Sequence, residues 1–223
     1  MVKQERAART REVLVRAAAE VFAEEGFVTA SIAAISKRAG VSAGGLHFHF
    51  GSKTALAEAV ARRASATLRT ITVSRVPDGN ALQALVDSTH ELMELLARDP
   101  VVNAGFGLCA GTGAVTLTAR GGGAGWDLRV QWQRWVEGTF RAAQREGRLA
   151  DGVSPQAAAA AVVAAMVGFG VLGAGAGAGG SRQFGPSGVT PYWQLMLPRL
   201  AARGSLGELV PDGSDAVRAS LPY

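Results

Sequence analysis

The sequence predicts an all-α protein in which a short basic segment precedes a longer, nearly neutral helical body. Apolar residues recur every three or four positions over most of the 223 residues, and no segment keeps the alternation of a β-strand. Residues 1–63, called the head below, hold ten Lys or Arg and six Glu, so they carry +4 of the formal net charge of +5. A content of 48% hydrophobic residues suffices for a buried core and excludes disorder over most of the chain.

The head is expected to form four helices separated by turns that contain glycine and serine. Ser31 and Ser52 suit the N-caps of the second and fourth helices, and Gly26 and Gly40 suit the ends of the first and second. The expected ranges are residues 6–25, 32–39, 43–50 and 53–72. Two short helices joined by a glycine-containing turn in basic surroundings are typical of a helix-turn-helix, whose second helix enters the major groove of DNA. An ordinary helical hairpin is the alternative.

The body is expected to contain five further helices, placed by the same apolar periodicity. Their expected ranges are residues 81–97, 101–110, 126–146, 157–174 and 190–200. Ser154 followed by Pro155 suits the start of the fourth of these helices. The tail beyond Arg203 is expected to form only marginal structure.

Export and membrane insertion are not expected. Charged side chains interrupt the apolar positions of residues 1–22, which excludes a secretory signal there. A single cysteine, Cys109, forms neither an internal disulfide nor a cysteine-based zinc site, so the cytoplasm is the expected compartment. Residues 152–181 carry no charge and are long enough to cross a bilayer. Because they are mostly Ala and Gly and lack closely flanking aromatic anchors, we expect a helix buried in a soluble protein and no membrane contact.

Three short patterns resemble chemical motifs but lack their context. Residues 51–54 resemble the end of a phosphate-binding loop, and residues 105–110 a dinucleotide fingerprint, yet neither follows a predicted strand. His47 and His49 lie two positions apart, hence on different faces of a helix, and have no carboxylate partner at ligand spacing. We therefore expect no metal, cofactor or catalytic site. An enzyme that uses an apolar pocket is the competing class, but no paired carboxylates or nucleophile–base pair support it.

Residues 8–60 carry a set of short motifs in register: Gly26-Phe27, Ala39-Gly40-Val41, Phe48-His49-Phe50 and Ser52-Lys53. With these motifs the head resembles the N-terminal DNA-binding domain of the TetR family of transcriptional regulators. The resemblance implies a helix-turn-helix DNA-binding domain at residues 1–52 and a helical ligand-binding and dimerisation domain at residues 53–223. It also implies double-stranded operator DNA as a partner.

The resemblance assigns DNA contacts to ten positions of this chain. The residues expected to line the major groove are Ser42, Ala43, Gly44, Gly45 and His47. The residues expected to contact phosphates, or an adjacent groove for the two arginines, are Ser31, His49, Lys53, Arg6 and Arg9. Family members often carry Lys at position 43 and Tyr at position 47, so the base preference of a relative does not transfer to this chain.

Within the family, the motif Arg9-Thr10-Arg11, the Phe-His-Phe close and the turn at residues 146–149 resemble the γ-butyrolactone receptors. This resemblance places a pocket tryptophan at Trp132, whose ring would pack on a lactone or furan and whose N–H would donate to a carbonyl. Burial of Trp132 and Trp135 as ordinary core residues is the alternative. The other expected pocket residues are Phe106, Leu108, Cys109, Val136 and Phe169.

These observations predict a ligand-responsive repressor that binds a palindromic operator as a homodimer. A small apolar signal, such as a γ-butyrolactone, butenolide or furan, is expected to release it and so to control antibiotic biosynthesis genes. An antibiotic or its biosynthetic intermediate is the alternative inducer. The resemblance to the TetR family implies a homodimer that pairs through residues 155–175 and 190–201. The small residues of the first segment would allow close contact between two helices, and packing within one chain is the alternative.

Overall fold

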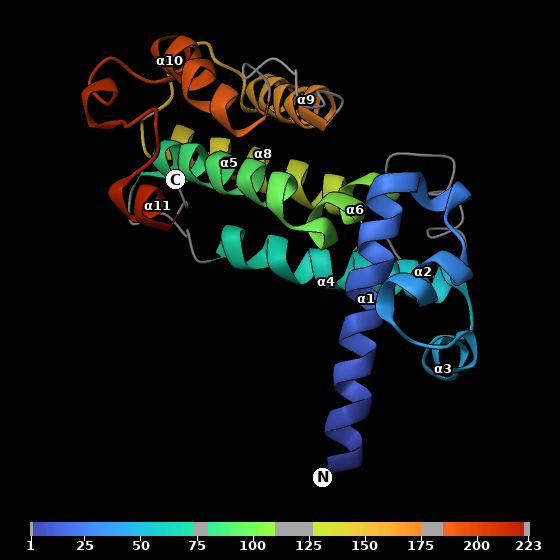
Figure 1. Cartoon of the computed structure of the whole chain (residues 1–223). Coiled ribbons are helices and arrows are strands. Elements are labelled where there is room, and N and C mark those ends of the chain that lie inside the picture. Colours follow the sequence, from blue (N-terminus) through green and yellow to red (C-terminus); the bar gives the residue numbers. More distant parts are fainter. Residues whose placement is uncertain (1, 74–79, 110–126, 175–184, 221–223) are drawn as a thin grey trace. The chain divides into compact units, whose positions relative to one another are not determined.

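The computed structural model describes residues 2–73, 80–109, 127–174 and 185–220, and Figure 1 shows them as helices joined by turns. Within these ranges the structure has no β-strand, which confirms the all-α prediction. The described residues form two compact units, the first within residues 1–68 and 99–131 and the second within 69–98 and 132–223. The boundary predicted between residues 52 and 53 is a functional division and stays a prediction.

The first unit is built around α1 (Val2–Thr29), which packs against α2 and α6. Its other helices are α2 (Ile32–Ala39), α3 (Ala43–His49), α4 (Lys53–Val73) as far as Leu68, and α6 (Pro100–Leu108). Their apolar faces form one core, whose largest buried members include Leu14, Phe22, Ile35, Leu46, Phe50 and Leu56. The backbone leaves helical geometry at Gly26 (φ 77°, ψ 160°), as predicted for the end of the first helix, and α1 continues beyond this kink to Thr29. At its other end α1 begins at Val2, four residues before the predicted start.

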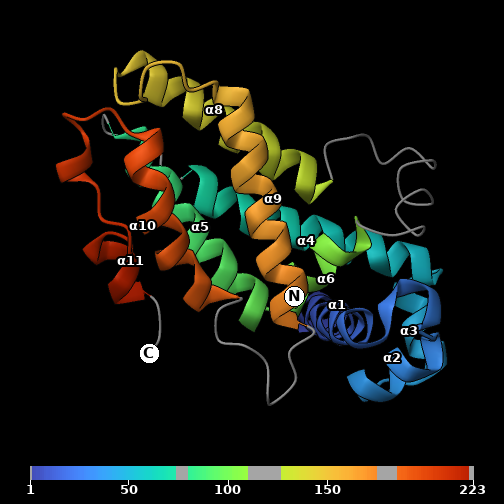
Figure 2. The ribbon, with the colours of Figure 1, turned by 90° about the horizontal axis from the view of Figure 1, so that it is seen from above.

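The second unit contains the end of α4 and the helices of the body from α5 onward. They are α5 (Ala81–Arg98), α8 (Leu128–Arg145) from Trp132 onward, α9 (Pro155–Ala174), α10 (Val189–Leu200) and α11 (Asp215–Ser220), with 3-10 turns at Pro186–Gly188 and Leu206–Glu208. Figures 1 and 2 show α9 and α10 as a layer over α5 and α8. The helices predicted at residues 81–97, 157–174 and 190–200 match α5, α9 and α10 to within two residues.

The turn at residues 146–149 connects three helices of the second unit. Glu146 Oε2 accepts a hydrogen bond of 3.0 Å from the Ala81 amide and so caps the first turn of α5. Arg148 and Leu149 then run antiparallel to the end of α10, with hydrogen bonds from Ala150 N to Leu200 O and from Ala202 N to Arg148 O, both 2.8 Å. The turn motif is therefore explained by packing within the chain.

The tail beyond Arg203 is more structured than predicted, since it forms a 3-10 turn and α11. Polar side chains of α5 bind its backbone. Gln83 Oε1 accepts from Val210 N (2.8 Å), and the buried Asp87 carboxylate accepts from Ser214 N (2.8 Å) and Ser214 Oγ (2.7 Å). These partners lie 127 residues apart in the chain, so the local periodicity of the tail gave no sign of them.

The two glycine motifs that resemble nucleotide loops have structural roles. A Cβ on Gly105 would lie 2.4 Å from Ala64 Cβ, so this glycine allows α6 to pack closely against α4. Ser52 Oγ accepts from Ala55 N (3.1 Å) and caps α4 as predicted. Both patterns thus belong to helix packing and helix capping.

Candidate nucleic-acid interface and ligand site

The turn between α2 and α3 is fixed by local hydrogen bonds. Ser31 Oγ accepts from Ala34 N and Ser42 Oγ from Gly45 N, each at 3.1 Å, so both serines cap the helix that they precede. Gly40 ends α2 in the left-handed conformation (φ 64°), which L side chains rarely adopt. Since a hydroxyl can accept and donate at once, both exposed serines keep an O–H donor for a phosphate.

The short helix α3 has one buried and one exposed side. Leu46 and the C-cap Phe50 are 0% and 3% exposed and anchor it in the core of the first unit. The predicted groove residues Ser42, Ala43, Gly44 and His47 are exposed together, whereas Gly45 and His49 are half-buried. The structure therefore brings five of the ten predicted DNA contacts (Ser42, Ala43, Gly44, Gly45 and His47) together on α3 and its N-cap.

Gly44 and Gly45 differ in the space around them. A Cβ on Gly44 would meet nothing within 4 Å, but a Cβ on Gly45 would lie 2.9 Å from Val41 Cγ1 and 3.2 Å from Ser42 Oγ. Gly45 is thus required by the turn itself. At Gly44 the chain has room for a side chain, so packing within the chain does not require glycine there. The missing side chain would allow the close approach of a DNA base edge.

We expect opposite effects when each of these glycines is replaced by alanine. Gly44→Ala should raise the thermal midpoint, because alanine stabilises a helix by about 0.5–1 kcal/mol relative to glycine, while operator affinity should fall roughly tenfold. Gly45→Ala should lower the thermal midpoint. Thermal unfolding and a DNA titration of both variants check this. A Gly44→Ala variant with wild-type DNA affinity would remove Gly44 from the groove contacts.

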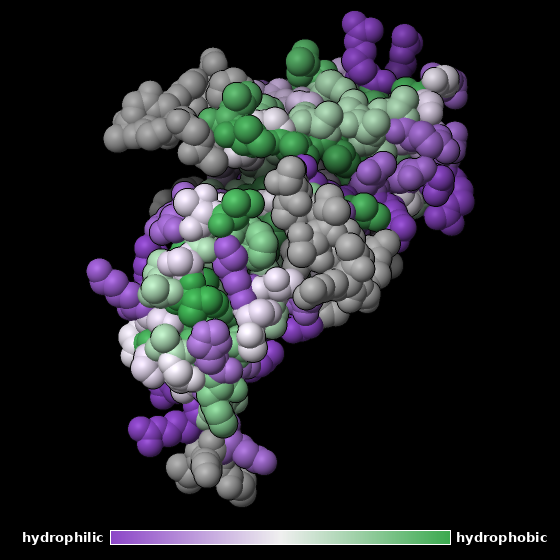
Figure 3. Space-filling view, turned by 90° about the vertical axis from the view of Figure 1, so that its right-hand side faces the viewer, coloured by the Kyte–Doolittle hydropathy of each residue, from purple (hydrophilic) through white to green (hydrophobic). Residues whose placement is uncertain are grey.

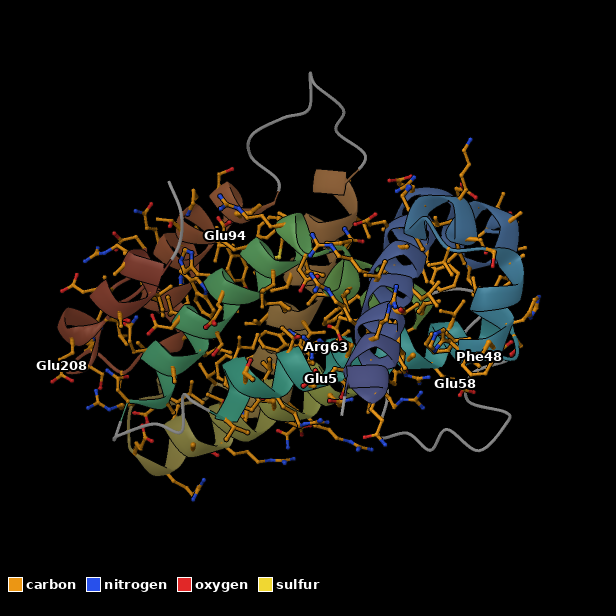
Figure 4. The ribbon with its side chains drawn as sticks, turned by 60° about the horizontal axis from the view of Figure 1, so that its bottom comes forward. Glu5, Phe48, Glu58, Arg63, Glu94 and Glu208 are labelled. Carbon is orange, nitrogen blue, oxygen red and sulfur yellow. The ribbon has the colours of Figure 1, made fainter. Side chains whose placement is uncertain are left out.

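Phe48 is an interface candidate that the sequence reasoning missed. Its side chain is 85% exposed and projects from α3 into solvent, with its ring 5.3 Å from that of His49 (Figure 4). A large apolar side chain this exposed on a short helix suits contact with thymine methyl groups or sugars. The sequence analysis used Phe48 only as a family landmark, because the three- and four-residue spacing marks inward positions and is silent about exposed aromatic ones.

Lys53 lies at the first turn of α4 and contacts the end of α1. Its Nζ donates to Val28 O (3.1 Å) and Ala30 O (2.7 Å) and lies 4.8 Å from the centre of the Phe27 ring. An ammonium has three N–H donors, so these two bonds leave one for the predicted phosphate contact. The side chain therefore also stabilises the junction between α1 and α2.

Four arginines of the head differ in their surroundings. Arg6 and Arg9 are exposed and lie in the first turns of α1. Figure 1 shows the N-terminal end of α1 extending away from α2 and α3. Arg38 instead binds Glu24 through two hydrogen bonds (2.8 and 2.6 Å), and this pairing lowers the pKa of Glu24. Arg11, which the sequence reasoning did not select, donates to His49 O (3.3 Å) and covers the Phe50 ring at 4.3 Å, so it supports the end of α3.

The six predicted ligand contacts fall in both compact units. Phe106, Leu108 and Cys109 belong to the first unit and Trp132, Val136 and Phe169 to the second. Leu108 is 5% exposed and is part of the apolar core of the first unit. Burial raises the pKa of the half-buried Cys109 thiol, which keeps it protonated and agrees with a packing role.

Trp132 differs from Trp135 and Trp193 in its hydrogen bonding. Trp135 Nε1 donates to Thr72 O (3.1 Å), and Trp193 Nε1 donates to Thr89 Oγ1 (2.7 Å). Trp132 is 1% exposed and stacks on Trp135 with ring centres 5.1 Å apart, yet its Nε1 has no hydrogen-bond partner among the described residues. An unpaired buried donor costs about 1–3 kcal/mol, so Trp132 suits a ligand that supplies an acceptor.

Tyr192 on α10 is a second polar group that the sequence reasoning missed. Its hydroxyl is buried with no partner among the described residues, and desolvation raises its pKa to about 12. Its ring makes an edge contact with Phe169, with ring centres 5.9 Å apart. Tyr192 of α10 therefore places an unpaired hydroxyl beside Phe169 of α9, a predicted pocket residue. Residue spacing along one helix does not reveal such a contact between two helices.

One face of α9 is exposed although it is apolar. Pro155, Ala158, Ala159, Val162 and Met166 are the buried positions, and only 22% of the apolar window Pro155–Gly173 is buried inside the chain. Besides Gln156, the exposed positions are apolar and recur at helical spacing: Ala157, Ala160, Ala161, Ala164, Val171 and Leu172. Figure 3 shows the resulting apolar surface in the upper part of the molecule. The prediction that this helix is buried therefore fails within a single chain.

Comparison with known proteins supplies the family context. Residues 14–60 match the model of bacterial regulatory proteins of the tetR family. The A-factor receptor protein of Streptomyces griseus is 31% identical over 216 residues, which cover 96% of this chain and 71% of that protein. A γ-butyrolactone receptor described as ArpA-like superposes with a TM-score of 0.77 at 20% identity over 97% of this chain and 99% of its own. TylP, a tetR regulator from Streptomyces fradiae, has a TM-score of 0.71 and 30% identity over 96% of both chains.

Proposed function

Because this chain belongs to the tetR family of bacterial regulatory proteins, we propose that it is a ligand-responsive repressor that binds a palindromic operator as a homodimer. The exposed face of α3 carries the DNA-binding part of this proposal. It presents small and polar groups from Ser42 to His47, with room for a base edge at Gly44. DNA binding also suits a cytoplasmic location, as expected from the single cysteine.

The proposed dimer uses α9 and α10, the helices that match residues 155–175 and 190–201. On α9 the exposed stripe from Ala157 to Leu172 contains no charged residue. On α10 Leu195 is 74% exposed. Small residues let two helix backbones approach closely, and a second copy would cover this apolar surface without a membrane. Two heads held together in this way bind two half-sites about one helical turn of DNA apart.

The proposed inducer is a small apolar molecule with a carbonyl or ring oxygen, such as a γ-butyrolactone, butenolide or furan. The unpaired Nε1 of buried Trp132 carries this part of the proposal, because a carbonyl would satisfy it. Similarity to the A-factor receptor supports the lactone class and a role in antibiotic biosynthesis. An antibiotic or its biosynthetic intermediate with a similarly placed acceptor is the alternative.

A mobility-shift assay with DNA from upstream of the protein's own gene tests the proposal. A specific, saturable shift is expected with this DNA and not with coding DNA of equal length. Addition of a synthetic 2-acyl-γ-butyrolactone, or of extract from the source culture, should release the DNA. Equal binding to both DNAs would contradict the proposal that the upstream DNA contains a specific operator. Release by the extract but not by lactones would favour an antibiotic or its biosynthetic intermediate as the inducer.

Lys53→Ala should separate the two roles of this lysine. If Lys53 binds a phosphate, operator affinity falls and the slope of log K against log salt decreases in magnitude by about 0.9. Titration of operator DNA at several salt concentrations measures this slope. An unchanged slope with a lower thermal midpoint would leave Lys53 only its contacts with Val28 and Ala30.

A further inference from the structure

The hydroxyl of Tyr192 lies in a cluster of aromatic side chains that joins α9 and α10. The Tyr192 ring makes edge contacts with Phe169 of α9 and Trp193 of α10, with ring centres 5.9 and 5.2 Å apart, respectively. Trp193 Nε1 donates to Thr89 Oγ1 of α5 (2.7 Å), and the Thr89 hydroxyl donates to Val86 O (2.6 Å). The polar atoms of Trp193 and Thr89 thus have partners, whereas the buried Tyr192 oxygen has none among the described residues.

This hydroxyl is a neutral hydrogen-bond donor at physiological pH. Burial raises the pKa of Tyr192 to about 12, so the proton stays on the oxygen. A buried donor without an acceptor destabilises the state that holds it. A carbonyl or hydroxyl oxygen would satisfy the donor without charge, whereas a carboxylate would have to lose its hydration in apolar surroundings. The chemical group that fits is therefore an uncharged oxygen.

The packing around Phe169 leaves space on one side. Gly170 follows Phe169 on α9 and is half-buried. Among the described residues, a Cβ on Gly170 would meet only Leu96 Cδ1 of α5 within 4 Å, at the ordinary contact distance of 3.8 Å. The φ of Gly170 is not positive, so the backbone does not require glycine there. The missing side chain leaves space that suits the alkyl chain of a ligand.

Two buried side-chain donors of the second unit are unpaired among its described residues. They are Trp132 Nε1 on α8 and the Tyr192 hydroxyl on α10. A mostly apolar molecule with two uncharged oxygens would provide one acceptor for each donor. A γ-butyrolactone with an acyl side chain is such a molecule, because it has a ring carbonyl and a chain carbonyl.

We propose that Tyr192 is a specificity-determining residue that donates a hydrogen bond to a second uncharged oxygen of the inducer. This inference rests on the proposed function and adds which side-chain chemistry the inducer carries. Trp132 binds the ring carbonyl, and Tyr192 binds the oxygen of the acyl chain. A lactone with a plain alkyl chain leaves the Tyr192 donor unpaired, so it binds less tightly than the acyl lactone.

Two synthetic lactones that differ at one carbon test this role by calorimetry. They are 2-hexanoyl-γ-butyrolactone and 2-hexyl-γ-butyrolactone, which has a methylene group in place of the chain carbonyl. The wild-type protein should bind the hexanoyl lactone about tenfold more tightly than the hexyl lactone. Tyr192→Phe keeps the ring beside Phe169 and removes the O–H. It should reduce this preference to within about twofold, mainly through weaker binding of the hexanoyl lactone.

Thermal unfolding without ligand tests whether the hydroxyl is unpaired. Tyr192→Phe should raise the thermal midpoint by about 2–4 °C, because it removes a buried donor that has no acceptor. Trp193→Phe is the control on the same helix, since it breaks the bond to Thr89. It should lower the midpoint and keep the preference for the hexanoyl lactone.

The outcomes separate failure of this inference from failure of the proposed function. A preference for the hexanoyl lactone that persists in Tyr192→Phe would overturn the role of Tyr192 and leave the proposed inducer class intact. A lower midpoint together with this persistence would make Tyr192 a structural residue of the cluster. If the wild-type protein binds neither lactone, the proposed inducer class is wrong, and the role of Tyr192 in selecting it is wrong as well.

Discussion

Replacing Ala164 with arginine is expected to convert the dimer to monomers and to abolish tight operator binding. Ala164 lies in the exposed small-residue stripe of α9, so the monomer tolerates a longer side chain there. In a dimer the added guanidinium would be buried between two apolar helices without a partner, which costs several kcal/mol. Because linked heads gain about 10²- to 10⁴-fold in avidity, loss of the dimer should weaken operator binding by at least about a hundredfold.

Light scattering and a DNA titration measure the two parts of this prediction. Ala97→Arg is the control, since Ala97 is also an exposed helical alanine of the second unit but lies outside the stripe. It should remain dimeric and bind DNA normally. An Ala164→Arg variant that stays dimeric would move the interface away from α9. If the wild-type protein is a monomer at micromolar concentration, this would contradict the proposal that a homodimer binds a palindromic operator.

Trp132→Phe is expected to abolish the response to the inducer at concentrations that release the wild-type protein. Alanine at this position would leave a large cavity and cost about 3–5 kcal/mol, whereas phenylalanine keeps most of the ring and removes the N–H. A ligand carbonyl would then lose its donor, so the inducer concentration for half-release should rise about 10- to 100-fold. Calorimetry with a 2-acyl-γ-butyrolactone should show the same loss in ligand affinity.

The control for this variant is Trp193→Phe, because the Trp193 N–H already has a partner in Thr89. It should bind the lactone as the wild-type protein does. A Trp132→Phe variant with normal inducer sensitivity would support the alternative that Trp132 is an ordinary core residue. A variant that binds the lactone normally but releases DNA poorly would assign Trp132 to coupling and not to ligand contact.

The head was predictable because its signals are local in sequence. The caps at Ser31 and Ser52, the left-handed Gly40 and the inward positions Leu46 and Phe50 all depend on neighbours within about four residues. Apolar periodicity likewise predicted the helices of the body. Exposure of Phe48 was missed because periodicity identifies the buried side of a helix and does not rank the residues on the other side.

Contacts between distant segments were beyond the reach of the sequence. Residue spacing alone could not tell which indole N–H, that of Trp132 or that of Trp135, has a hydrogen-bond partner. The N–H of Trp135 is paired because Thr72, 63 residues away in the chain, lies next to it in the fold. The ordered tail depends on Gln83 and Asp87, and the need for glycine at residue 105 depends on Ala64. A helical sequence specifies which face is apolar, but the partner that satisfies each buried donor is chosen only when helices from distant parts of the chain pack together.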